Sequence, residues 1–171
     1  MSRRFVRRGA AVVASFSAPE IELLGTWVPE QLRAVYESDD SADAARQRLF
    51  PRAYLDPTEE SAEQEWQALV YPDLLRSRLE SLARILGVLD APERGKRGLL
   101  TVELGPDDVP ALLGVLNDTR LALGTILDVT DDTELAELDP DDPSTQVSMI
   151  YVWLTHIEGE LVDTLLGELP D

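Results

Sequence analysis

The 171-residue chain contains no cysteine and only one histidine, His156. Without cysteine it forms no disulfide, thiolate metal site, cysteine nucleophile or thiol redox switch. A metal site built on several histidines is excluded as well, because a zinc site needs three or more protein ligands. No apolar run approaches the roughly 18–20 residues that a membrane helix needs. The chain is therefore expected to have no membrane span and no metal or other cofactor.

Basic residues are almost missing from the second part of the chain. Residues 98–171 contain 17 Asp or Glu and one base, Arg120, whereas residues 1–97 contain 14 bases and 16 acids. The net charge of −18 therefore comes mostly from residues 98–171. An acidic chain is a poor general nucleic-acid binder, since phosphates require basic surface. The acidity serves either as a solubilising surface or as a docking face for a basic protein.

Hydrophobic periodicity predicts a single α+β domain over residues 1–171 that is predominantly α-helical. About five helices and a small two-stranded sheet are expected. The strands are predicted at 3–16 and 99–104, and the helices at 18–37, 56–70, 73–89, 106–127 and 145–167.

Proline and turn residues refine these boundaries. Ser17 and Glu20 have the spacing of a capping box, which predicts a helix start. Pro29 should kink or split that helix, and Tyr71-Pro72 should interrupt the next one. The polar segment 38–47 is expected to be a loop or a weak helical turn, and the basic segment 93–98 a turn.

Arg120 is the most informative single residue. It follows Leu116 by four positions and precedes Leu123 by three, which places it on or beside the buried stripe of its helix. An arginine there must be paired or line a cavity, because burying an unpaired charge is prohibitive. It predicts either a structural bridge to a carboxylate or an anion-binding pocket. Asn117 lies one turn earlier and is the second candidate ligand-binding residue.

Residues 128–144 have no hydrophobic period and are predicted to form an acidic loop. A calcium-binding EF-hand is excluded, because Thr133 stands where that loop requires glycine. The candidate contacts to a basic partner are Asp131, Asp132, Asp139, Asp141 and Asp142.

Two other groups of residues have simpler interpretations. His156 and Glu160 are one helical turn apart, with Trp153 nearby, which favours a packing face over a metal or catalytic site. The N-terminal arginines 3, 4, 7 and 8 are interpreted as neutralising the acidic half or protecting a sheet edge. No phosphate-binding loop, dinucleotide fingerprint, serine-hydrolase elbow or zinc-protease motif is present, so no enzymatic activity is predicted.

Five stretches agree in order and spacing with a known family: PRAYLDPTEE, LVYPDLLRSRLESL, LLGVLNDTRLALGTIL, the DPDDP loop and IYVWLTHIEGELV. Together they resemble an actinobacterial family classed as a domain of unknown function and typified by the oxidative-stress regulator AosR. The resemblance covers about residues 51–162, and Asn117, Asp118 and Arg120 carry over best. It implies a non-enzymatic cytoplasmic protein of stress-responsive transcription regulation, with a sigma factor as partner. The paired-cysteine switch of that family is absent from this chain.

The leading hypothesis is therefore a regulatory binding protein that presents an acidic surface to a basic protein. The alternative is a small-molecule or anion-binding protein with a pocket around Arg120. A homodimer formed through exposed apolar helices is a further alternative.

Overall fold

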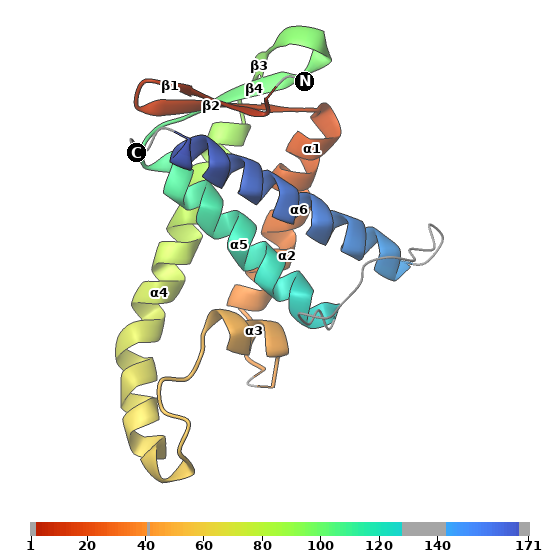
Figure 1. Cartoon of the computed structure of the whole chain (residues 1–171). Helices are drawn as coiled ribbons and strands as arrows, with labels where there is room; N and C mark the ends of the chain where they lie inside the picture. The colour runs from red at the N-terminus through yellow and green to blue at the C-terminus, as the bar shows by residue number, and fades with distance from the viewer. Residues whose placement is uncertain (1–2, 41, 128–142, 168–171) are drawn as a thin grey trace.

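The computed structural model describes residues 3–40, 42–127 and 143–167. Helices dominate, and four antiparallel strands form a sheet across one end of them (Figure 1). In sheet order the strands are β1 (Phe5–Arg8), β2 (Ala11–Phe16), β4 (Leu100–Leu104) and β3 (Glu93–Arg94). The helices are α1 (Ala18–Glu22), α2 (Val28–Tyr36), α3 (Ala44–Leu49), α4 (Glu60–Leu89), α5 (Asp108–Ile126) and α6 (Pro143–Leu166). A π-helical turn, Leu23–Trp27, joins α1 to α2.

The predicted α+β class and the predominance of helix are confirmed. Since α1, the π-helical turn and α2 form one continuous helical stretch, this stretch and α3 to α6 make five helices among the described residues, in agreement with the predicted number of about five. The two-stranded sheet is wrong, since four strands are present among the described residues. Residues 3–16 fold back on themselves as a β1–β2 hairpin, and Gly9 takes the positive φ of 62° that its two-residue turn requires. The segment predicted as a turn at 93–98 also contributes the short strand β3. Strands of two and four residues are too short to show the alternation of apolar and polar residues from which strands are predicted.

The prolines act differently from one another. Near Pro29 the chain stays helical: it widens into the π-helical turn, and α2 then begins with Pro29 in its first turn. The predicted interruption at Tyr71-Pro72 is wrong, because α4 runs unbroken through Pro72. Pro72 is exposed, so the carbonyl that loses its helical partner there can be hydrated.

Segment 38–47 is also more ordered than predicted. Asp43 caps α3 by accepting hydrogen bonds from the backbone N–H groups of Ala45 and Arg46. Burial of Ala45 and Leu49 then holds this short helix against the core.

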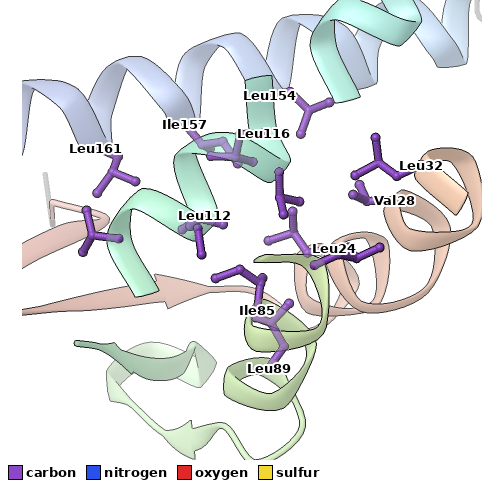
Figure 2. Packing of buried hydrophobic residues seen from close by; sticks show 14 of the residues in the cluster. Leu24, Val28, Leu32, Ile85, Leu89, Leu112, Leu116, Leu154, Ile157 and Leu161 are labelled. Atoms are coloured by element: carbon purple, nitrogen blue, oxygen red, sulfur yellow. The ribbon is translucent and has the colours of Figure 1, made fainter. Parts of the chain in front are cut away.

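Helix α5 lies at the centre of the molecule and contacts α2, α3, α4 and α6. Figure 2 shows the resulting core, in which leucines of α5 meet apolar side chains of the other helices. Leu112 and Leu116 are buried against residues such as Leu154 and Ile157 of α6. No helix of the described ranges combines the length and apolar character that crossing a bilayer would demand.

Glu20 ties the sheet to two helices. The predicted capping box is present, with the backbone N–H of Ser17 donating to the Glu20 carboxylate at 2.7 Å. The same carboxylate pairs with Arg4 at 2.9 Å and accepts from the indole N–H of Trp153 at 2.9 Å. Partial burial acts to raise the pKa of Glu20, but these donors outweigh it and lower the pKa to about 2.

This low pKa predicts a specific loss of stability in acid. A carboxyl group whose pKa is lower in the folded state stabilises the protein above its unfolded pKa, and that contribution disappears as the pH falls. We expect Glu20→Gln to be less stable than the wild type at pH 7 and to lose less stability between about pH 4.5 and about pH 2. Urea denaturation at several pH values measures this. Parallel pH profiles for the two proteins would contradict the assignment. Glu22→Gln, at an exposed neighbour, is the control.

Candidate functional site

The LNDTR stretch of α5 sends its polar side chains in different directions. Successive helical residues are rotated by about 100°, so Asp118 and Arg120 point to opposite sides of the helix. Asn117 is exposed, and Asp118 is buried toward α2 and α4. Arg120 points toward α6. Asn117 lies one helical turn before Arg120, but it is not among the residues that form the pocket beside the Arg120 guanidinium.

Arg120 joins α5 to α6. Its guanidinium forms an ion pair with Glu158, and its Nε donates to the Thr155 hydroxyl at 2.9 Å. The guanidinium carbon also lies 5.8 Å from the centre of the Tyr151 ring. The side chain is partly buried, at 26% exposure. This is the bridge to a carboxylate that one sequence-based interpretation predicts.

A pocket of about 430 Å³ lies beside the same guanidinium. It is formed where α3, α5 and α6 meet, by Ala44, Arg48, Arg120, Leu121, Gly124, Thr125 and Tyr151. Arg48 is exposed and has no ion-pair partner among the described residues, whereas the charge of Arg120 is balanced by Glu158. Among the described residues, the pocket thus contains one guanidinium that is paired with a carboxylate and one that is not.

Asp118 is the centre of a buried polar cluster on the other side of α5. Its carboxylate accepts a hydrogen bond of 2.7 Å from the Tyr36 hydroxyl and forms an ion pair with Arg78. Burial and the adjacent carboxylate raise the pKa of Tyr36 well above its usual range, so the phenol stays protonated and donates. The cluster links α2, α4 and α5.

Helix α3 is attached to the same cluster. Arg78 also donates to the Leu49 carbonyl at 2.9 Å, and Arg46 donates to the Tyr36 carbonyl at 2.7 Å. Both guanidinium groups lie against the ring of Phe50, with centroid distances of 5.4 Å and 4.8 Å. These contacts use the planar face and the fork of arginine together, which lysine cannot reproduce.

Sequence reasoning singled out Arg120 and missed the partners of Asp118. One signal was available: Asp118 lies three residues after Val115 and four before Ala122, so helical spacing places it in the buried stripe. Its partners Tyr36 and Arg78 could not be identified, because they lie on other helices.

The predicted contact residues Asp131, Asp132, Asp139, Asp141 and Asp142 lie outside the described residues. His156 is 67% exposed and lies 3.7 Å from Glu160, on the surface of α6. Within the described ranges, no three potential His, Cys, Asp or Glu ligands come together to hold a metal ion.

The buried cluster predicts that mutation of Asp118 lowers the stability of the fold strongly, whereas mutation of its neighbour Asn117 hardly changes it. Asp118→Ala leaves Arg78 and Tyr36 without their acceptor, so we expect a loss of about 3 kcal/mol in the free energy of unfolding. Asn117→Ala, at the exposed neighbouring position, should change it by less than about 0.5 kcal/mol. Urea denaturation of both variants measures the difference. Equal losses would show that Asp118 does not hold the helices together.

One comparison with known proteins identifies a family. The sequence model described as "Domain of unknown function (DUF2017)" matches residues 2–165. No curated protein matches the chain. No solved structure matches it either. Because the match spans nearly the whole sequence, the protein belongs to the family described as Domain of unknown function (DUF2017).

Proposed function

We propose that this protein is a cytoplasmic regulatory binding protein that docks a basic protein partner through the acidic segment 128–142. That segment has eight Asp or Glu and no Lys or Arg. The resemblance to AosR favours a stress-responsive sigma factor as the partner. Since the chain has no cysteine, its binding is not controlled by a thiol switch of its own.

The distribution of ion pairs is the observation that supports this proposal. Four acids of α5 and α6 are each paired with an arginine: Asp108 with Arg84, Asp118 with Arg78, Glu158 with Arg120 and Glu160 with Arg4. Three of these arginines come from residues 1–97, so acids of α5 and α6 are partly neutralised within the fold. Segment 128–142 contains eight of the 17 acids of residues 98–171 and no base of its own.

The expected mechanism is electrostatic steering followed by docking. A concentrated group of like charges raises the association rate of an oppositely charged partner, and salt weakens that effect because it screens the field. Close contacts then determine how long the complex lasts.

Binding to a purified stress-responsive sigma factor tests the proposal. In the test variant, residues Asp131, Asp132, Asp139, Asp141 and Asp142 are all changed to Asn. We expect the dissociation constant to rise by about tenfold in this variant, and by a similar factor for the wild type between about 0.05 M and about 0.3 M salt. Fluorescence anisotropy measures both effects.

A control variant with the same change in net charge separates the segment from overall acidity. It carries Gln or Asn at five exposed acids of the N-terminal half, namely Glu22, Glu30, Glu37, Asp39 and Glu65. This variant should bind nearly as well as the wild type. Equal weakening of the two variants, or association that does not respond to salt, would overturn the proposal.

A second candidate function is supported by the pocket between Arg48 and Arg120. Arg48, which has no ion-pair partner in the part of the chain that the structure describes, and the volume of about 430 Å³ suit a small anion. A phosphate or carboxylate ligand would be bound there by charge-assisted hydrogen bonds.

Calorimetric titration with inorganic phosphate and with citrate tests this pocket. If the site binds anions, Arg48→Ala should weaken binding by about tenfold, because a charge-assisted hydrogen bond contributes about 1.5–3 kcal/mol. Arg33→Ala, at an exposed arginine of α2, should leave it unchanged. The absence of saturable binding would reject this alternative.

A further inference from the structure

The outer face of the sheet carries a large groove that the proposed function does not use. Alternation along the strands turns Val12, Ala14 and Val102 toward the helices and leaves Val13, Thr101 and Glu103 on the opposite face. The groove on that face has a volume of about 1160 Å³ and extends to Gly87 and Val88 near the end of α4. It is wide enough for an extended chain segment.

The turn between β3 and β4 forms one wall of the groove and holds its basic residues in place. The backbone N–H of Gly95 donates to the Leu99 carbonyl at 2.8 Å, which closes the turn. A side chain at Gly95 would lie 2.8 Å from a methyl carbon of Thr101, so the close approach requires glycine. Arg97 has a left-handed backbone with φ of 57° and is the only non-glycine residue of the described ranges with positive φ. Such a conformation costs energy and is retained where the surroundings impose it.

Five exposed cations line this groove. They are Arg3, Arg8, Arg94, Lys96 and Arg97. Within the part of the chain that the structure describes, none of them forms an ion pair or a side-chain hydrogen bond, unlike Arg4, Arg78 and Arg84, which are each paired with a carboxylate. Two acids, Glu93 and Glu103, share the lining. The groove is therefore basic overall, on a protein whose net charge is −18.

Aliphatic side chains line the groove together with these charges. Val6 is 47% exposed there, and Val13, Val88 and Leu99 also line the groove. Among the described residues that line it, none is aromatic. A surface that combines cations with aliphatic side chains fits a ligand that alternates carboxylates with apolar groups.

We propose that this groove binds an acidic, extended segment of a partner protein, with aliphatic side chains between its carboxylates. Single-stranded RNA fits less well, because such sites add aromatic stacking platforms to their basic surface. Glu93 and Glu103 would also repel an evenly spaced phosphate backbone, whereas the acids of a peptide can be spaced to avoid them. A second copy of this chain is disfavoured by the mutual repulsion of two molecules of charge −18.

This proposal does not depend on the proposed function. The C-terminal half of α6 reaches the sheet, where Glu160 pairs with Arg4, and the helix runs about 26 Å from Glu160 back to its start at Pro143 (Figure 1). The start of α6 is therefore well separated from the sheet that carries the groove. A protein with both surfaces would bridge a basic partner and an acidic one.

Anisotropy titration of the full chain with a labelled 15-residue peptide of alternating Asp-Glu pairs and leucines tests the groove. The test variant carries Arg8→Ser, Lys96→Ser and Arg97→Ser. We expect the dissociation constant of the peptide to rise by about tenfold in this variant. A control with the same loss of charge, Arg33→Ser, Arg52→Ser and Arg76→Ser at exposed positions outside the groove, should bind the peptide like the wild type.

Arg97→Gly separates binding from folding. Glycine adopts positive φ without strain, so this variant should melt at the same or a higher temperature and yet bind the peptide several-fold more weakly.

Equal affinity of the test and control variants would overturn the proposal. Tighter binding of poly-uridine RNA than of the peptide, or dimerisation in light scattering that the test variant abolishes, would replace it with one of the other occupants. Either result leaves the sigma-factor experiment unaffected, because that experiment alters residues 131–142.

Discussion

The burial of the Asp118 carboxylate is the constraint on which the helical arrangement depends. A carboxylate removed from water must be matched by donors, since an unpaired buried charge is strongly unfavourable. Tyr36 and Arg78 supply those donors from α2 and α4, and Arg78 also holds α3 through the Leu49 carbonyl. One charged residue of α5 thereby determines how three other helices are placed around it. Apolar contacts alone would specify their orientation less strictly.

Ion pairs between carboxylates and arginines also join other elements of the fold. Arg120 fixes α6 to α5 through Glu158, and Arg4 fixes the sheet to α1 and α6 through Glu20 and Glu160. Arg4, from the nearly balanced part of the chain, thus pairs with acids of both parts, whereas Arg120 pairs within the acidic part. Beside these pairs, five exposed cations line the groove on the outer sheet face, and segment 128–142 contains eight acids and no base. These two concentrations of charge are the basis of the two proposed binding surfaces.

Local signals in the sequence predicted local structure well. The Ser17–Glu20 capping box is present because both partners lie within one helical turn, and the helix widens into a π-helical turn just before Pro29 for an equally local reason. Pro72 did not interrupt α4, because packing on both sides of an exposed proline outweighs the loss of one hydrogen bond. Strand β3 was missed because it owes its conformation to pairing with β4 and has no alternation of its own.

The sequence by itself determined the class of the fold, most helix positions, the unequal distribution of charge and the exclusion of thiol chemistry. These properties follow from composition and from contacts between residues close together in the chain. The tertiary structure decided which side of α5 each polar residue faces, that Asp118 rather than Asn117 is buried, and that Arg120 is neutralised by Glu158. It also brought Arg3 and Arg8, from the start of the chain, to the same groove as Arg94, Lys96 and Arg97. These arrangements join residues that are tens of positions apart, and only the packing of helices and strands brings them together.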